Sequence, residues 1–172
     1  MRVLTTPRLA LDELTDADAS FLVALLNDPD FLRYIGDRGV RNEDDARVYL
    51  AKGPFDSYRR HGHGLWLVRR RDDAERLGIC GLLKRDTLDD VDLGFAFLPQ
   101  FRGQGYARES AAAVLAHARD ALGIARVVAI ASRDNDASAR LLEAVGLRFE
   151  RLVRLGVDSP ELALFVPPTV RR

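Results

Sequence analysis

The chain has a single cysteine, so no disulfide can form within it, and the class of small disulfide-stabilised domains is excluded. That residue, Cys80, lies in the apolar run Leu77–Leu83 with no histidine near it in the sequence. We therefore expect a buried, unreactive thiol rather than a nucleophile. No apolar run is long enough to span a bilayer, and Met1–Pro7 contains no apolar signal core. These absences predict no membrane partner and a cytoplasmic location.

Excess charge of either sign is also lacking, because 26 Lys and Arg residues balance 26 Asp and Glu residues. A neutral chain does not attract nucleic acid over its whole surface, so we expect no direct nucleic-acid binding. We also predict no metal site. The length of 172 residues suffices for one sizeable core, and residues 1–172 are expected to form a single domain.

The apolar pattern predicts four helices among seven strands. Thr15 caps a first helix that Asn27–Pro29 ends, and Asn42 caps a second that continues to about residue 60. A third helix follows the glycine-rich turn at residues 103–105 and ends at Gly123, and a fourth covers residues 135–145. Strands are expected at residues 8–14, 65–68, 76–84, 91–98, 127–131, 147–155 and 161–166.

The order of these elements predicts an α+β domain with a mixed sheet. Residues 127–131 are wholly apolar, as expected of a parallel strand that is buried on both faces. With the strand at 91–98 and the helix between them, they form a right-handed βαβ unit, which predicts one central parallel pair. Gly94, isolated within its strand, indicates a bulge or a close backbone approach.

A glycine-rich turn, Gln100-x-x-Gly103-x-Gly105, joins the strand at 91–98 to an alanine-rich helix. Glycines let the backbone approach a ligand, and the helix N-terminus offers unpaired N–H groups and a partial positive charge. The segment is therefore typical of a phosphate-binding turn. The dinucleotide fingerprint needs a third glycine where Arg108 stands, and the Gly-Lys-Ser/Thr of the P-loop is absent. Taken alone, the pattern also fits a plain tight turn into a helix.

A second motif, Asn135-x-x-Ser138-x-x-Leu141-x-x-x-x-Gly146, follows the strand at 127–131. Together the two motifs resemble the GNAT superfamily of acetyl-CoA-dependent N-acetyltransferases, and the resemblance covers roughly residues 5–166. Other segments are similar to the Rim-type branch, which acetylates the N-termini of ribosomal proteins: Thr6–Leu11, Asn27–Pro29, Gly78–Gly81 and Asp92–Phe95. The chain departs from that branch at Asp12, where arginine is common, and at Asp92, where glutamate is common.

The resemblance implies the acyl-CoA N-acyltransferase fold, a mixed and mostly antiparallel twisted sheet with a central splayed parallel pair and flanking helices. It implies acetyl-CoA as cofactor, CoA as product and an amine acceptor, which is either a peptide N-terminus or a small amine. A homodimer is a further possibility, because dimers are common in such folds.

The resemblance also assigns residues to the cofactor. Backbone groups near Phe97 and Leu98 would pair with the pantetheine arm. Asn135 would bond the amide region of the cofactor, and Arg140 would reach its adenosine-phosphate end. The pyrophosphate would be wrapped by Arg102, Gly103, Gln104, Gly105, Tyr106 and Ala107, with the Arg102 side chain available to a phosphate.

The implied reaction is direct attack of a neutral amine on a thioester, which needs a polarised carbonyl, a free amine and a protonated leaving thiolate. We assign a backbone N–H of the strand near Leu98 to the carbonyl and the Ser138 hydroxyl to the departing sulfur. Asp92, acting through water, is the candidate base. The structural alternatives are that Ser138 caps its helix and that Asp92 is a surface carboxylate at the start of a strand.

Other polar groups have competing interpretations. Glu109, in the first helical turn, is interpreted as a structural carboxylate that complements the helix dipole. His61 and His63 would line the acceptor mouth or take a proton if catalytic, but histidines in loops are usually solvent-exposed. Residues 34–36 lie where the resemblance places the acceptor wall. The non-enzymatic alternative is a CoA-binding regulatory or interaction domain without catalysis.

Overall fold

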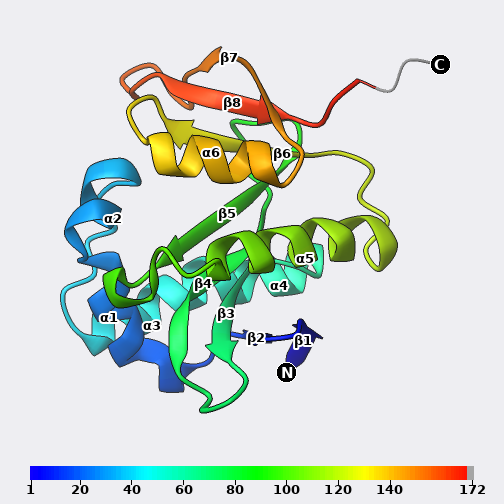
Figure 1. Cartoon of the computed structure of the whole chain (residues 1–172). Coiled ribbons are helices and arrows are strands. Elements are labelled where there is room, and N and C mark those ends of the chain that lie inside the picture. Colours follow the sequence, from blue (N-terminus) through cyan, green and yellow to red (C-terminus); the bar gives the residue numbers. More distant parts are fainter. Residues whose placement is uncertain (170–172) are drawn as a thin grey trace.

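The computed structural model describes residues 1–169, which form an eight-stranded sheet with helices on both faces (Figure 1). The strand order is β1-β2-β3-β4-β5-β6-β8-β7, and every neighbouring pair is antiparallel except β5 and β6. The predicted mixed sheet with one central parallel pair is confirmed. The strands are β1 (Arg2–Thr5), β2 (Leu9–Glu13), β3 (Leu65–Arg70), β4 (Arg76–Leu83), β5 (Val91–Phe97), β6 (Val127–Ser132), β7 (Arg148–Val153) and β8 (Leu162–Val166).

Four α-helices lie between β2 and β3, and two more flank β6. In residues 1–169, no helix has both the length and the apolar character needed to cross a membrane. The helices are α1 (Ala19–Leu26), α2 (Pro29–Tyr34), α3 (Glu43–Lys52), α4 (Pro54–His61), α5 (Tyr106–Asp120) and α6 (Asp136–Ala144), with short 3-10 turns η1 (Asp16–Asp18) and η2 (Pro99–Phe101).

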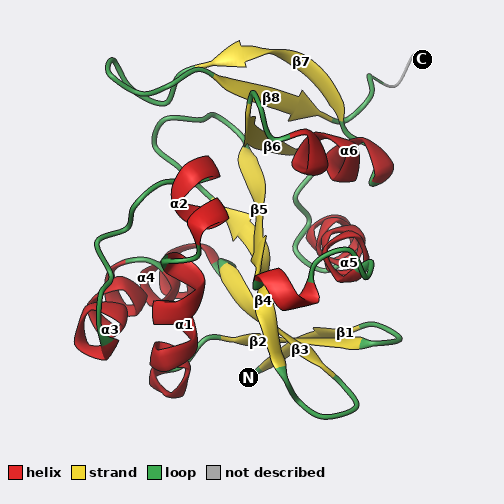
Figure 2. Cartoon of the chain, turned by 60° about the vertical axis from the view of Figure 1, so that its left-hand side comes forward, coloured by secondary structure: helices red, strands yellow, loops and turns green. Residues whose placement is uncertain are grey.

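The sheet separates two hydrophobic cores (Figure 2). Helices α5 and α6 pack with Trp66 on one face, and helices α1 and α3 pack over Leu67 on the other. Because successive side chains of a strand point to opposite faces, β5 contributes Leu93 and Phe97 to the first core and Ala96 to the second. Strand β5 is thus in contact with both helical layers.

The segment predicted as one helix from Asn42 to residue 60 is two helices, α3 and α4. Asn42 caps α3 as expected, because its side chain accepts a hydrogen bond from the Asp45 N–H. The Gly53 N–H donates to the Tyr49 carbonyl (2.9 Å), and Pro54 then occupies the first position of α4. Proline lacks an N–H and fits the start of a helix better than its interior, so a new helix begins there.

Residues Asn27–Pro29 end α1 as expected, but they also begin α2, which the sequence pattern did not predict. The Asp28 side chain accepts a hydrogen bond from the Phe31 N–H (3.1 Å), and Pro29 stands at the first helical position. Strand β1 is likewise additional, because four residues show too little alternation to be recognised. It pairs with β2 at the edge of the sheet.

Gly94 marks neither a bulge nor a close approach of backbone, because its near neighbours are side-chain atoms. Strands β4 and β5 pair without interruption from Gly78↔Phe97 to Leu83↔Asp92. A Cβ atom on Gly94 would lie 3.2 Å from Cδ1 of Leu83, so a larger residue would crowd this neighbour. Register shifts occur instead in three other strand pairs: β1–β2 at residues 2–4, β3–β4 at residues 68–69 and β7–β8 at residues 149–151.

Strands β5 and β6 pair only at their first residues, Val91↔Val127 and Asp92↔Val128. Beyond these positions β6 pairs with β8, starting at Ala129↔Phe165. The C-terminal half of β5 therefore has a neighbour only on its β4 side within the described residues. This divergence is the splay that the resemblance implies, and it sets the position of the candidate site.

Candidate active site

The open edge of β5, defined here as the side of residues 95–97 that faces away from β4, presents backbone groups without a strand to bind them. The Leu98 N–H donates to the Leu77 carbonyl of β4 (3.0 Å). Backbone groups of successive strand residues point to opposite edges, so the N–H groups of Phe95 and Phe97 point away from β4. The prediction that Leu98 polarises the thioester carbonyl is therefore corrected, because its N–H is already bound in the sheet.

The glycine-rich turn connects this edge to the N-terminus of α5. Gly103 and Gly105 have φ values of +73° and +83°, a conformation that residues with a side chain rarely adopt. The first hydrogen bond at the start of α5 runs from the Glu109 N–H to the Gly105 carbonyl (3.0 Å). The N–H groups of residues 106–108 precede that bond, so they remain for a ligand, and the helix dipole favours an anion there.

Contacts from the N-terminal segment hold the turn in place. Arg8 Nη1 donates to the Gln104 carbonyl (2.9 Å), and the Arg8 guanidinium lies 4.5 Å from the centre of the Tyr106 ring. The Glu109 carboxylate accepts hydrogen bonds from the Thr6 hydroxyl (2.5 Å), the Arg8 N–H (3.1 Å) and Arg8 Nε (2.8 Å). Burial disfavours the charged form, but these hydrogen bonds outweigh it and lower the pKa of Glu109. The structural interpretation of Glu109 is confirmed.

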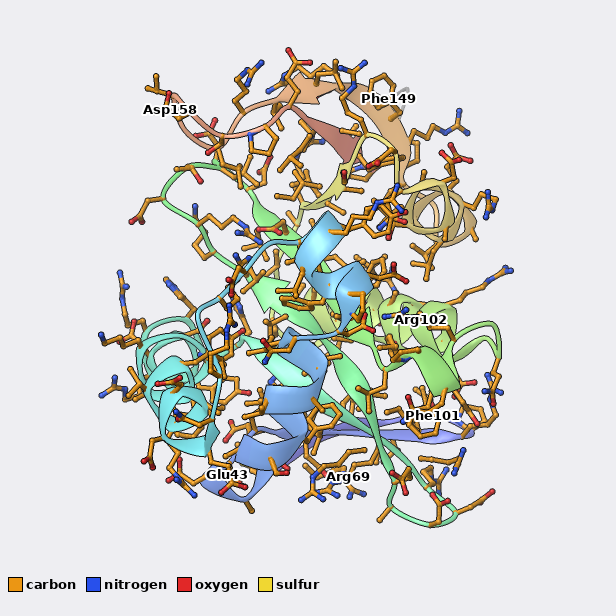
Figure 3. All side chains as sticks on the ribbon, turned by 90° about the vertical axis from the view of Figure 1, so that its left-hand side faces the viewer. Glu43, Arg69, Phe101, Arg102, Phe149 and Asp158 are labelled. Atoms are coloured by element: carbon orange, nitrogen blue, oxygen red, sulfur yellow. The ribbon has the colours of Figure 1, made fainter. Side chains whose placement is uncertain are left out.

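The Arg102 side chain is engaged elsewhere and is not free for a phosphate, which corrects the prediction made for it (Figure 3). Its Nε donates to the Phe97 carbonyl (3.0 Å), Nη1 to Asp30 (2.8 Å) and Nη2 to Asp28 (2.5 Å). The Asp28 side chain is only 4% exposed. Arg102 therefore links the open edge of β5 to the start of α2.

At the start of α6, the capping residue is Asn135. Its Oδ1 accepts a hydrogen bond from the Ser138 N–H (3.2 Å). The half-buried Ser138 hydroxyl forms no hydrogen bond within residues 1–169, so the alternative in which Ser138 caps the helix is not observed. Arg140 is exposed on the same helix. The roles of Asn135, Ser138 and Arg140 toward the cofactor stay predictions.

Asp92 is almost fully buried, with 1% of its side chain exposed, so the alternative of a surface carboxylate is wrong. Its Oδ1 accepts a hydrogen bond from Arg85 Nε (3.0 Å). Burial raises the pKa of Asp92, although the Arg85 guanidinium opposes that shift. Asp92 lies three residues before Phe95, or about 10 Å along the strand, so a chain of water molecules would have to connect it to the reacting groups.

The two histidines differ in environment. His63 is buried with Nδ1 3.2 Å from the Leu82 carbonyl, and burial lowers its pKa. His61 is exposed and stacks on His63 with ring centres 5.6 Å apart. The expectation of solvent exposure therefore holds for His61 alone. Across the part of the chain that the structure describes, no group of three potential metal ligands occurs.

Sequence reasoning missed the contacts that fix α2. Besides the bonds from Arg102, Arg33 Nη2 lies 3.3 Å from Asp134 Oδ2 in the β6–α6 connection. The partners of these ion pairs are separated by 72 to 101 positions in the chain. No local pattern contains such pairs. The Asp28-Pro29 dipeptide is the one available signal, because an acidic residue before proline is a common helix start.

The model of the acetyltransferase (GNAT) domain family matches residues 8–148. The chain belongs to this family. GNAT membership supports transfer of an acetyl group from acetyl-CoA to an amine, with CoA as the other product. The arrangement of this site agrees with such a cosubstrate, because a glycine-rich turn and unpaired N–H groups at a helix start suit a pyrophosphate.

Two relatives match this chain over most of their length, one by sequence and one by structure. The N-acetyltransferase YoaA of Bacillus subtilis strain 168, itself uncharacterised, is 29% identical over 154 residues, covering 88% of this chain and 86% of YoaA. A protein from Bordetella pertussis assigned to the GNAT family of acetyltransferases is 26% identical, with a TM-score of 0.80 and coverage of 98% and 100%.

More distant structures show the fold alone. The ribosomal L7/L12 alpha-N-protein acetyltransferase RimL is 16% identical, with a TM-score of 0.80 and coverage of 96% of this chain and 93% of RimL. The spermidine N-acetyltransferase of Vibrio cholerae, solved with CoA and spermine, is 15% identical, with a TM-score of 0.77 and coverage of 94% and 95%.

Proposed function

We propose that this GNAT protein acetylates a primary amine, either the N-terminal α-amine of a protein or a small amine, by direct attack within a ternary complex. The observation that carries the proposal is the continuity of the open edge of β5 with the glycine-rich turn. An extended arm laid along that edge finds strand-like hydrogen bonds, and its pyrophosphate then meets the N–H groups before α5.

Acetyl-CoA supplies the activated acetyl thioester. In this proposal the Phe95 and Phe97 N–H groups bind the arm and the thioester carbonyl, in place of the Leu98 N–H. The amides of residues 103–108 bind the pyrophosphate. Each hydrogen bond to a charged group contributes about 1.5–3 kcal/mol before the costs of binding. Several such bonds to the pyrophosphate are therefore enough for measurable affinity.

The amine itself sets how much catalytic help is needed. An α-amine with a pKa near 8 is roughly one-tenth neutral at pH 7, which costs about 1.4 kcal/mol. A lysine side chain with a pKa near 10.4 costs about 4.6 kcal/mol to deprotonate at the same pH. We propose that Asp92, through water, removes the proton and that the Ser138 hydroxyl bonds to the departing sulfur. Such modest assistance suits an α-amine acceptor.

The acceptor is proposed by similarity. RimL acts on a protein α-amine and the Vibrio cholerae enzyme on spermidine, and both share this fold. The segments that resemble the Rim-type branch favour the α-amine. The non-catalytic CoA-binding alternative is not favoured by the comparisons.

Two measurements test the proposal. Acetyl-CoA and CoA should raise the thermal midpoint of the protein, whereas ATP and NAD should not. Thiol release from acetyl-CoA should then accelerate with at least one acceptor in a panel of peptides beginning with serine, alanine or methionine, beside spermidine. A protein that neither acetyl-CoA nor CoA stabilises contradicts the proposal. Stabilisation without turnover on any acceptor would support the non-catalytic alternative.

A further inference from the structure

We propose that Arg102 is a positioning residue for the acceptor side of the site, and that its side chain does not bind phosphate. It fixes α2 to the open edge of β5. The inference rests on the proposed function, because the acceptor is expected to meet the acetyl group at that edge.

Arg102 binds three acceptors from two parts of the fold. Its guanidinium donates to the Phe97 carbonyl and to the carboxylates of Asp28 and Asp30, so three groups from two elements converge on one cation. Charge-assisted bonds of this kind are the strong ones, and a planar guanidinium holds several acceptors in fixed directions. A phosphate would have to compete with two carboxylates for a cation they already neutralise.

Burial makes the Asp28 contact the decisive one. The Asp28 side chain is 4% exposed and also accepts the Phe31 N–H at the start of α2. Without Arg102, this buried carboxylate would have no cation facing it. The uncompensated charge would destabilise the first turn of α2. Asp30 is 54% exposed, so its bond to Arg102 contributes little in water.

At the other end of α2, Arg33 lies 3.3 Å from Asp134, which follows β6. Both side chains are 61% exposed, so this pair contributes little and the Asp28 contact remains the main attachment of α2. Figure 2 shows α2 beside β5, on the side away from α5. Leu32 and Ile35 of α2 are 37% and 43% exposed, and they offer an acceptor an apolar surface. The position of α2 therefore sets where an acceptor lies relative to the edge.

Two variants distinguish whether the Arg102 side chain holds α2 in position or binds a phosphate. Arg102→Gln removes the cation. Asp28→Asn removes the charge of its buried partner but keeps a side-chain oxygen for the Phe31 N–H, and Arg102 retains only the Phe97 carbonyl and the exposed Asp30 carboxylate as partners. Arg119→Gln is the matched control, because Arg119 is an exposed arginine whose only ionic partner within residues 1–169 is its neighbour Asp120.

Hydrogen exchange and calorimetry are the primary measurements. Both variants should accelerate amide exchange in residues 30–36 by about tenfold, because the opening of α2 becomes easier, while exchange in α5 stays unchanged. Titration with CoA should give dissociation constants within about threefold of the wild-type value, which is under 1 kcal/mol. The control variant should match the wild type in both.

Kinetics supply a readout that a merely structural role would not change. With the peptide of the panel that reacts fastest, both variants should raise the acceptor KM by about tenfold with a smaller change in kcat. Arg102→Lys should recover part of this loss, because a lysine keeps the positive charge but lacks the planar guanidinium that donates several hydrogen bonds in fixed directions.

A CoA affinity at least tenfold weaker in Arg102→Gln, a tighter CoA affinity in Asp28→Asn, or unchanged exchange of α2 in both variants would overturn the inference. Failure of the proposed function looks different. A wild-type protein that does not bind CoA contradicts that function. The amide exchange rates of α2 in the two variants would still show whether Arg102 holds this helix in position.

Discussion

Two neighbouring side chains at the start of α6 have separate tasks that substitution can distinguish. Asn135 caps the helix, whereas the Ser138 hydroxyl has no hydrogen-bond partner within residues 1–169. Ser138→Ala should therefore leave the thermal midpoint unchanged and lower kcat by about tenfold, as expected when one hydrogen bond of about 1.4 kcal/mol to the departing sulfur is lost. Asn135→Ala should instead cost about 1 kcal/mol of stability. Thermal unfolding and thiol release measure both, and full turnover by Ser138→Ala would refute its role.

The proposed role of Asp92 as a base predicts how activity changes at acidic pH. A base works only when ionised, so activity should fall as the pH drops through the pKa of Asp92. Because burial raises that pKa, the fall should occur at a higher pH than the ordinary carboxyl value of about 3.9. Asp92→Asn should lower kcat by about 10- to 100-fold and abolish this limb, without weakening CoA binding.

The control for Asp92 lies two residues away. Asp90 forms an exposed ion pair with Arg126 just before β5 begins. Asp90→Asn should keep the wild-type rate and the wild-type pH profile, because exposed pairs contribute little. A pH profile that is unchanged in Asp92→Asn would exclude the carboxylate as the base.

At the scale of elements, the turn before α5 has a glycine requirement that is both structural and functional. An alanine at Gly105 meets a φ of +83° and places Cβ 3.1 Å from Arg8 Nη2. Gly105→Ala should cost roughly 1–2 kcal/mol of stability and weaken CoA binding by about tenfold, because the N–H groups of the turn are displaced. Calorimetry with CoA measures the second effect.

Gly123, after the other end of α5, provides the comparison. It has a φ of +65° with open space around its Cβ position. Gly123→Ala should lose comparable stability but keep the CoA affinity of the wild type. Equal loss of affinity in the two variants would mean that Gly105 acts only through general stability.

The elements also show what the sequence could predict. Strands β3 and β5 and helices α5 and α6 were recognisable because their apolar periods are regular and glycine or asparagine marks their ends. Helix α2 was not, since Asp28-Pro29 can end one helix and begin another. The ion pairs of Arg102 could not be predicted for a different reason. The carboxylates that Arg102 contacts lie 72 and 74 positions away in the chain, and no local pattern indicates which distant charge a side chain will meet.

For the whole molecule, the single thiol is a probe of folding. Cys80 is fully buried beneath the α5 layer, and burial raises its pKa to about 12. Only the thiolate reacts readily, so a disulfide reagent should label the native protein at the slow rate of its unfolding. Adding CoA should be avoided, because it is itself a thiol, but acetyl-CoA should slow labelling further. Urea-unfolded protein should react at once, and rapid labelling of the native state would contradict this burial.

The divergence of β5 and β6 also has a consequence for how affinity is stored. A continuous sheet would satisfy the N–H groups of Phe95 and Phe97 within the fold, at no gain to any ligand. In this fold β6 does not form those bonds, because it pairs with β5 at only two positions. Under the proposed function, the extended arm of the cosubstrate would bind these N–H groups as an added strand does, so part of its affinity would come from hydrogen bonds that the sheet itself does not make.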